Sequence, residues 1–120
     1  MFDKILYDKL RTEAHPIIKQ FVYLIENHCH EQKRLTFYIK KLDITEQQLA
    51  FLTSQKFNIS PVDIPKLFLV KKITEKLATT EIRLKELSHQ FGFKSPATFT
   101  KFIRTTTGFT PSRYRALKCI

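Results

Sequence analysis

The sequence predicts an all-α fold, and three observations carry that prediction. Phe, Leu and Ile recur at helical spacing, β-branched residues do not alternate with polar ones, and the chain has only two glycines. Hydrophobic residues make up 42% of the 120 residues, which is ample for a packed core and excludes a chain that is disordered by composition. This length corresponds to one domain, or to two small lobes that share a helix.

A repeat of about fifty residues is the strongest internal pattern. An offset of 50 places residues 58–61 (Asn-Ile-Ser-Pro) on residues 108–111 (Gly-Phe-Thr-Pro). Upstream the offset becomes 49 and places Asp43 on Gly92, so that the extra residue of the second copy lies in a turn. The apolar positions agree in phase with these segments. The chain therefore contains two copies of one supersecondary unit.

The second copy is predicted to be two helices joined by a tight turn. Its first helix has an apolar face at i, i+3, i+7 spacing and a small residue, Ser88, where two helices would cross. Gly92 permits the left-handed conformation that ends a helix, and Ser95 with Pro96 suits the start of the next one. This order is typical of a helix-turn-helix. The inward residues are Leu84, Leu87 and Phe91, then Phe99, Phe102 and Ile103, and Gly108 ends the second helix.

The first copy follows the same plan less closely. Asp43-Ile44 forms the turn, Asp43 must tolerate the left-handed region, and Thr45 is the N-cap of the second helix. Ile39 occupies the position of Ser88, which predicts a wider or differently packed crossing. The inward residues are Leu35, Tyr38 and Leu42, then Leu49, Leu52 and Phe57.

Helices are also predicted outside the copies. Residues 16–31 carry a broad apolar stripe, residues 64–79 form a connecting helix with Pro65 near its start, and residues 111–117 form a last short helix. Residues 1–14 are ambiguous between a frayed helix and the end of a linker. The expected organisation is a linker or N-terminal extension at 1–14, a first helix-turn-helix subdomain at 15–60, the connecting helix at 61–79, and a second subdomain at 80–120.

The net charge of +10 is unevenly distributed. Residues 1–65 hold nine Lys and Arg against eight Asp and Glu, whereas residues 66–120 hold twelve against three. Concentrated positive charge favours a polyanion as partner, with a merely basic surface or anionic lipid as the alternatives. The basic residues are spread over several helices, which argues against one amphipathic membrane-binding face. No apolar run has the length of a transmembrane helix or the form of a signal peptide, and two distant cysteines make no disulfide framework, so a reduced cytoplasmic location is expected.

Sites for catalysis or metal binding are not expected. His28-Cys29-His30 resembles a ligand cluster, but adjacent side chains on a helix point about 100° apart and do not converge on one ion. His89 is expected to be a surface residue. The sequence contains no phosphate-binding glycine loop, nucleophile elbow or paired carboxylates. The prediction is a protein that is not an enzyme and has no catalytic residue, metal or cofactor.

The second copy resembles the AraC/XylS family of bacterial transcription regulators. The resemblance rests on Leu84-Lys-Glu-Leu-Ser-His-Gln-Phe-Gly-Phe93, then Ser95, Phe99, Phe102, Gly108, Thr110-Pro111 and Tyr114-Arg115, and it covers roughly residues 15–118. It implies a C-terminal DNA-binding domain of seven helices that activates or represses transcription through successive major grooves. It also implies double-stranded DNA and RNA polymerase as partners, an upstream effector-binding or dimerisation domain, and an arginine at position 115 that holds the last helix in place.

The sequence departs from the family pattern at a few positions. Thr74 stands where the family usually has alanine, and Ile39 replaces a small residue. Ala50 and Phe51 occupy positions where many members carry polar or basic side chains. These departures concern the DNA contacts of the first copy.

Candidate DNA contacts follow from the exposed positions of each second helix. Lys101 and Arg104 suit guanine acceptors, Gln47 suits adenine, and Ala97 or the Thr100 methyl suits a thymine methyl. The candidate base contacts are Gln47, Ala50, Phe51, Ala97, Thr100, Lys101 and Arg104. The candidate phosphate contacts are Lys40, Lys41, Thr45, Ser54, Lys94, Ser95, Thr98 and Arg113.

Two hypotheses remain from the sequence. In the first, the second copy supplies most of the electrostatic affinity for DNA and the first copy mainly modulates specificity, because Asp43 and Glu46 oppose Lys40 and Lys41 near the phosphates. In the alternative, the chain is a helical protein–protein interaction module with weak or no DNA binding. An exposed Phe51 would favour that alternative.

Overall fold

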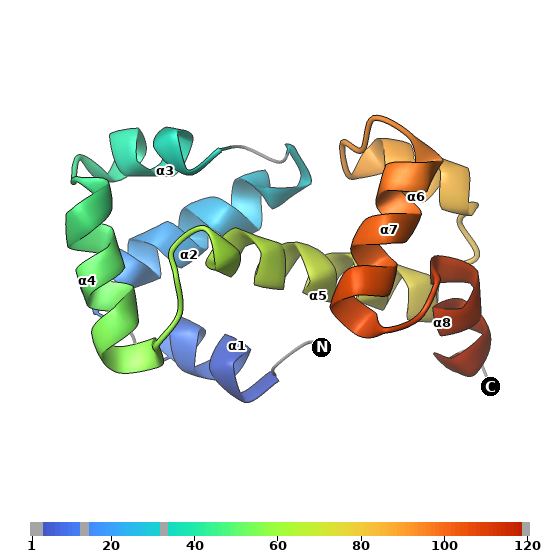
Figure 1. Cartoon of the computed structure of the whole chain (residues 1–120), viewed down its shortest axis with the longest axis horizontal. Coiled ribbons are helices and arrows are strands. Elements are labelled where there is room, and N and C mark those ends of the chain that lie inside the picture. The colour runs from blue at the N-terminus through green and yellow to red at the C-terminus, as the bar shows by residue number, and fades with distance from the viewer. Residues whose placement is uncertain (1–3, 13–14, 32–33, 119–120) are drawn as a thin grey trace. The chain divides into compact units, whose positions relative to one another are not determined.

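The computed structural model describes residues 4–12, 15–31 and 34–118, and these residues are almost entirely helical (Figure 1). The elements are α1 (Lys4–Thr12), α2 (Pro16–His28), the 3₁₀ turn η1 (Cys29–Glu31), α3 (Leu35–Leu42), α4 (Glu46–Phe57), α5 (Asp63–Thr79), α6 (Leu84–Gln90), α7 (Pro96–Thr107) and α8 (Pro111–Lys118). None of the helices in these ranges has the length and apolar character needed to cross a bilayer. The predicted all-α fold with two helix-turn-helix segments is confirmed.

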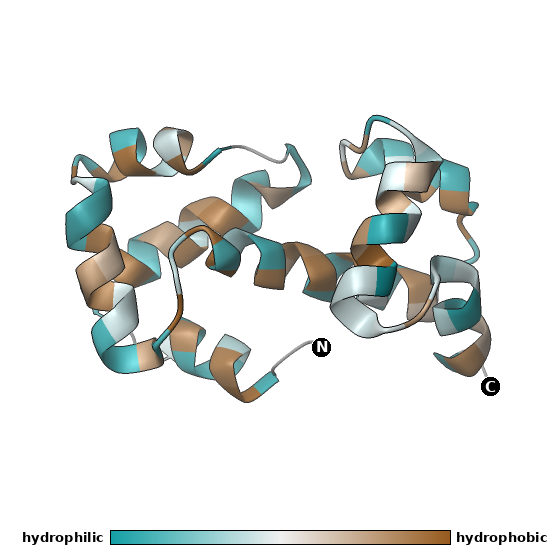
Figure 2. Cartoon of the chain, viewed as in Figure 1, coloured by the Kyte–Doolittle hydropathy of each residue, from teal (hydrophilic) through white to brown (hydrophobic). Residues whose placement is uncertain are grey.

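The chain divides into two compact units within α5. The N-terminal unit extends to Phe68 and the C-terminal unit starts at Leu69. Each unit has its own apolar core, and α5 contributes Ile64 and Phe68 to the first and Ile73 and Leu77 to the second. Figure 2 shows apolar and polar residues mixed along each helix, as expected where every helix buries one side only.

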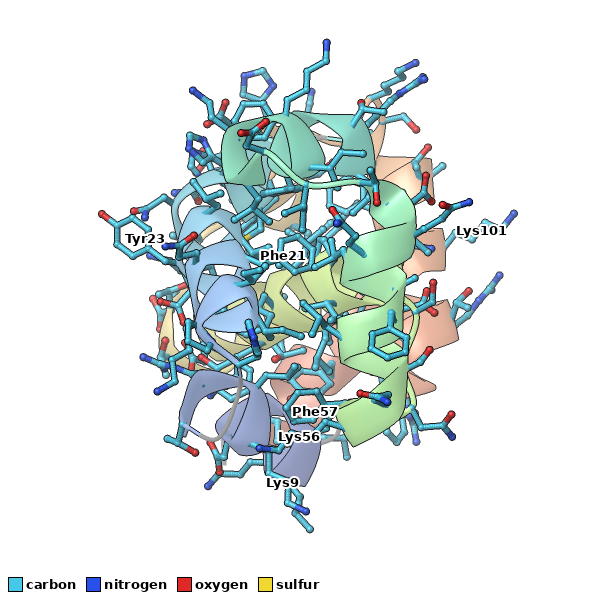
Figure 3. The ribbon with its side chains drawn as sticks, turned by 90° about the vertical axis from the view of Figure 1, so that its left-hand side faces the viewer. Lys9, Phe21, Tyr23, Lys56, Phe57 and Lys101 are labelled. Atoms are coloured by element: carbon cyan, nitrogen blue, oxygen red, sulfur yellow. The ribbon has the colours of Figure 1, made fainter. Side chains whose placement is uncertain are left out.

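The described residues form eight α-helices, one more than the seven implied by the resemblance, and the additional helix, α1, belongs to the N-terminal unit. Leu10 of α1 has no exposed surface, and Tyr7 packs on Phe68 with ring centroids 4.8 Å apart. The sequence left residues 1–14 open between a frayed helix and the end of a linker. The described part, Lys4–Thr12, is a helix that packs into the core of the N-terminal unit. Along α2 the predicted stripe faces the core: Ile18, Phe21, Val22 and Ile25 are buried, and Ile17 and Leu24 are half-buried. Figure 3 shows Phe21 pointing inward, whereas Tyr23, 68% exposed, projects away from the unit.

In the C-terminal unit, Arg115 holds α8 against the end of α5. Its Nε donates to the carbonyl of Leu77 at 3.1 Å and its Nη1 donates to the carbonyl of Ile82 at 2.6 Å. The Leu77 carbonyl belongs to the last turn of α5, where carbonyl groups lack partners within the helix. The structural role that the resemblance implied for Arg115 is therefore confirmed.

Tyr38 of α3 is buried in the core of the N-terminal unit. The residue has no exposed surface, and its ring lies edge-on to Phe21 with centroids 5.4 Å apart. Its hydroxyl has no hydrogen-bond partner among the described residues. Burial, with smaller contributions from Cys29 and Glu31, raises the pKa of Tyr38 to about 12.

We expect Tyr38→Phe to leave the free energy of unfolding at pH 7 unchanged or raised by up to about 1 kcal/mol, because the ring contacts stay and an unpaired hydroxyl is removed. The phenol ionises near pH 10 in the unfolded chain but only near pH 12 in the folded one. The wild type should therefore lose stability as the pH rises from 10 to 12, by up to about 2 kcal/mol more than the variant. Urea denaturation at pH 7 and pH 11 measures this difference, and equal alkaline losses in both proteins would contradict it.

Candidate nucleic-acid interface

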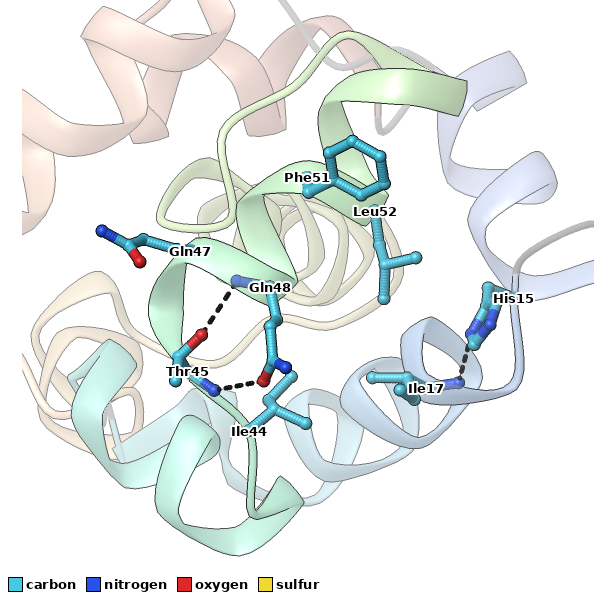
Figure 4. A pocket seen from close by; sticks show the side chains of 8 residues that line it. All are labelled: His15, Ile17, Ile44, Thr45, Gln47, Gln48, Phe51 and Leu52. Atoms are coloured by element: carbon cyan, nitrogen blue, oxygen red, sulfur yellow. Dashed lines mark hydrogen bonds between the residues drawn. The ribbon is translucent and has the colours of Figure 1, made fainter.

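The first helix-turn-helix consists of α3, a tight turn and α4. Asp43 adopts the left-handed conformation with φ 55°, and the backbone N–H of Ile44 donates to the carbonyl of Ile39 at 3.3 Å. Thr45 begins α4 with a complete capping box: the N–H of Gln48 donates to the Thr45 Oγ1 at 3.1 Å, and the N–H of Thr45 donates to the Gln48 Oε1 at 2.9 Å (Figure 4). Sequence reasoning found the Thr45 cap but missed Gln48, although the Thr-x-x-Gln spacing is its usual signal.

The second helix-turn-helix repeats this geometry with α6 and α7. Gly92 has φ 76°, and the N–H of Phe93 donates to the carbonyl of Ser88 at 3.0 Å. Ser95 caps α7 by accepting from the N–H of Thr98 at 3.2 Å. Ser88 is buried and donates to the carbonyl of Ser95 at 3.3 Å, so the small residue joins the first helix directly to the start of the second.

The two motifs share their left-handed positions, as the sequence repeat predicts, although the turn of the second motif is one residue longer. Among the described residues, the four with left-handed backbone are Asp43, Asn58, Gly92 and Gly108, and the repeat aligns them as two pairs. Each pair ends equivalent helices, the first of each motif and the second of each motif. The turn bond of Ile39 is the counterpart of the one made by Ser88, so the larger side chain does not remove it.

The outer face of α7 carries the basic candidates. Ala97, Lys101 and Arg104 are exposed and follow one another at i, i+4, i+7 spacing, which places them on one stripe. Figure 3 shows Lys101 directed away from the ribbon. Phe99 and Ile103, on the other side of the helix, are buried in the core of the C-terminal unit.

The outer face of α4 carries no cation at the positions that match Lys101 and Arg104. Gln47, Phe51 and Ser54 are exposed, and Phe51 is 60% exposed despite its large apolar ring. Glu46 is also exposed in the first turn of the helix.

Two predicted base contacts lie deeper than expected. Ala50 and Thr100 are half-buried rather than exposed. Successive residues on a helix are 100° apart, so Ala50 lies only about 60° from the direction of the buried Thr53, and Thr100 lies at the same angle from Ile103. Both therefore stand at the edge of the outer stripe.

Six of the eight predicted phosphate contacts lie near the two capped helix starts, whereas Ser54 lies in the third turn of α4 and Arg113 lies on α8. Lys40 and Lys41 lie in the last turn of α3, and Lys94 precedes the cap of α7. The side chains of Lys40, Lys41, Thr45, Ser54, Lys94, Thr98 and Arg113 are exposed, whereas Ser95 is half-buried. The cap hydroxyls are engaged in their own helices, since the Ser95 and Thr98 hydroxyls lie 3.0 Å apart.

A family model described as a helix-turn-helix domain matches residues 38–117, from the middle of α3 into α8. The chain belongs to the AraC-type helix-turn-helix family. The family and the fold are those of DNA-binding domains of transcription regulators, and the resemblance seen in the sequence is confirmed.

The AraC-type domain is similar to parts of longer proteins. It is 27% identical over 97 residues to "Histidine kinase P4" of Formosa agariphila, and the match covers 81% of this chain but 7% of that protein. Its fold matches the "xylose-binding transcription activator xylR" with a TM-score of 0.81 at 18% identity, over 92% of this chain and 29% of the other. It also matches the "DNA-binding domain of AdpA", solved "in complex with a target DNA", with a TM-score of 0.73 at 20% identity, over 87% of this chain and 93% of that one.

The AraC-type domain also has an open hollow between the start of α2 and α4 (Figure 4). Ile17, Ile44 and Leu52 supply apolar lining, and Phe51 stands beside them on α4. The remaining lining residues are His15, Thr45, Gln47 and Gln48. The hollow therefore adjoins α4, the second helix of the first helix-turn-helix.

The His28-Cys29-His30 segment lies at the end of α2 and in η1, away from both helix-turn-helix turns in the sequence. The Nδ1 of His28 pairs with the Oε1 of Glu31 at 2.9 Å, and Cys29 is buried. Within the ranges that the structure describes, no three histidine, cysteine or carboxylate side chains are grouped to hold a metal ion.

Proposed function

We propose that this AraC-type domain places α4 and α7 in successive major grooves of double-stranded DNA. The observation that carries the proposal is the matched pair of capped helices, each following a left-handed turn and each with an outer stripe that the core does not cover. Helices of this kind offer early exposed residues to base edges, while their caps and neighbouring cations hold phosphates. The fold that the domain shares with AdpA, which was solved with DNA, supports this assignment.

The two subdomains in this proposal comprise residues 15–60 and 80–120, with residues 61–79 as the connection. The second supplies most of the electrostatic affinity, because residues 80–120 carry eight Lys and Arg against two Asp and Glu. The first contributes mainly specificity, since Asp43 and Glu46 offset Lys40 and Lys41 beside the start of α4. The proposed base contacts are Gln47, Ala50, Phe51, Ala97, Thr100, Lys101 and Arg104. The proposed phosphate contacts are Lys40, Lys41, Thr45, Ser54, Lys94, Ser95, Thr98 and Arg113.

The domain is proposed to act as part of a larger bacterial regulator in the cytoplasm. The chain spans 7% of the length of the P4 protein and 29% of xylR, so further domains are expected beside it, among them an effector-binding or dimerisation domain. RNA polymerase is the proposed protein partner when the regulator activates transcription. We assign the domain no catalytic role, because its exposed stripes suit binding and hold no paired acid and base.

Selection of bound sequences from a random duplex pool tests the proposal. We expect two short enriched motifs whose centres lie about one helical turn (~10 bp) apart, because each recognition helix reads one major groove. The affinity for the selected duplex should fall steeply as the salt concentration rises. Failure to enrich any sequence, together with an affinity that does not respond to salt, would contradict DNA reading.

A protein–protein interaction module is the second candidate, and the 60% exposure of Phe51 beside the α2–α4 hollow is the observation that favours it. Exposed aromatic side chains are enriched at protein interfaces. This candidate predicts that the purified chain shifts no duplex in a gel at low salt. A salt-sensitive shift decides for DNA.

A further inference from the structure

The two proposed recognition helices, α4 and α7, can be compared position by position, because each starts after a capping hydroxyl residue. Thr45 and Ser95 each precede their helix, and the repeat offset of 50 relates them. The same offset pairs the outer-stripe residues: Gln47 with Ala97, Ala50 with Thr100, Phe51 with Lys101, and Ser54 with Arg104. Members of a pair therefore stand at equal distances from the start of their helices and occupy equivalent places in the two motifs.

The chemistry at these equivalent places differs. On α7 the last two of the four positions are cationic, Lys101 and Arg104, and both side chains are exposed. On α4 the same positions hold Phe51 and Ser54, and the outer stripe of α4 has an amide, a methyl group, an aromatic ring and a hydroxyl but no charge. In a major groove, cations suit the two acceptors of guanine, whereas an amide suits adenine and an apolar group suits the thymine methyl.

We propose that the domain reads two chemically different half-sites: α7 reads guanine through Lys101 and Arg104, and α4 reads A·T base pairs, with Gln47 on adenine and Phe51 packed on a thymine methyl group. This inference rests on the proposed function. The operator is accordingly asymmetric, although the two motifs that bind it share one fold.

Phe51 is the residue on which this assignment depends. Its ring is 60% exposed at a position where the other motif presents Lys101, one helical turn after Gln47. Phe51 also lines the α2–α4 hollow, together with the half-buried Ile17, Ile44 and Leu52. Because Phe51 occupies the position equivalent to Lys101 on the outer face of its helix, we take a DNA base, and not a ligand of the hollow, as its contact.

The first experiment uses the duplex selected by the chain itself, with single-atom changes in the bases. Deoxyuridine in place of thymine in the α4 half-site removes only the methyl group and should weaken binding about fourfold, the loss expected for one buried methyl. 7-Deazaguanine in the α7 half-site removes the N7 acceptor and should weaken binding about tenfold, the loss expected for a hydrogen bond to a charged donor. In Phe51→Ala the uracil effect should disappear, and in Lys101→Ala/Arg104→Ala the deazaguanine effect should disappear.

The second experiment exchanges the residues at the matched position. Phe51→Lys gives α4 the cation that α7 has there, so a new selection should replace thymine by guanine at that place in the α4 half-site and leave the α7 half-site unchanged. The slope of log K against log salt should become steeper by about one. Lys9→Ala is the matched control, because Lys9 is exposed on α1, outside both motifs, and this variant should select the wild-type sequence.

Each outcome decides between the inference and its rivals. Equal affinity for the thymine and uracil duplexes, or guanine-rich motifs in both half-sites, would overturn the inference while salt-sensitive binding still upheld the proposed function. A Phe51→Ala variant with unchanged affinity and base preference would also overturn it and would place Phe51 at a protein-binding hollow instead. The absence of any selected duplex would overturn both proposals together.

Discussion

Replacing Phe99 by alanine is expected to destabilise the C-terminal unit by about 3 to 5 kcal/mol, the range for removing a large buried aromatic side chain. Phe99 is 1% exposed and lies on the inner side of α7, where its ring packs edge-on against Phe93 with centroids 5.2 Å apart. Small domains have a total stability of about 5 to 15 kcal/mol, so this loss would leave the unit close to unfolding. Urea denaturation followed by circular dichroism measures it.

The matched control is Phe51→Ala on the equivalent helix of the other motif. Phe51 is 60% exposed, so its replacement should change the free energy of unfolding by less than about 0.5 kcal/mol. Because the chain has two cores, Phe99→Ala should also separate the unfolding curve into two transitions and leave the one of the N-terminal unit in place. Equal destabilisation by both substitutions would contradict the assignment of inner and outer faces.

Removing both cations from α7, in Lys101→Ala/Arg104→Ala, is expected to weaken binding to the selected duplex about a hundredfold or more. Each side chain is exposed on the outer stripe, and a good contact to a guanine is worth about 1 to 3 kcal/mol. If both cations also displace counterions, the slope of log K against log salt should fall by up to about two. Fluorescence anisotropy titrations at several salt concentrations measure both quantities.

Gln47→Ala separates specificity from electrostatic affinity in the same titrations. Gln47 is neutral, so its removal should weaken binding to the selected duplex yet leave the salt slope unchanged. Lys9→Ala should change neither quantity appreciably. Equal losses for Gln47→Ala and Lys101→Ala, or a salt slope that Lys101→Ala does not alter, would count against the division of roles between the two motifs.

The helix-turn-helix motifs could be predicted from the sequence because their determinants are local. Thr45 and Ser95 were recognised as caps, and the positions of Asp43 and Gly92 as left-handed turns, from residue type and spacing alone. A cap needs only an oxygen two or three residues before a free N–H, and a left-handed turn needs only a residue that tolerates positive φ. The repeat aligns the first copy with the second, so the turn and cap recognised in the second copy also locate those of the first.

The burial of residues at the edge of an apolar face is harder to predict, because it depends on how wide a surface the neighbouring helices pack against that face. Ala50 and Thr100 were expected to be exposed, but they are half-buried beside Thr53 and Ile103. An apolar stripe predicts which side of a helix faces the core, whereas the neighbouring helices decide how far around the helix burial extends. The base contacts at the two edge positions are therefore the weaker part of the predicted set.

The sequence by itself determined the helical class, the two capped recognition helices and the concentration of positive charge in the second half, since all of these follow from the order of residues along the chain. Only the tertiary structure decided that α1 belongs to the N-terminal core through Leu10, that Arg115 binds the carbonyls of Leu77 and Ile82, and that the Tyr38 hydroxyl is buried. Those contacts join residues that are distant in the sequence or depend on what surrounds them. Periodicity and capping describe a helix and its ends, but packing alone brings distant segments together.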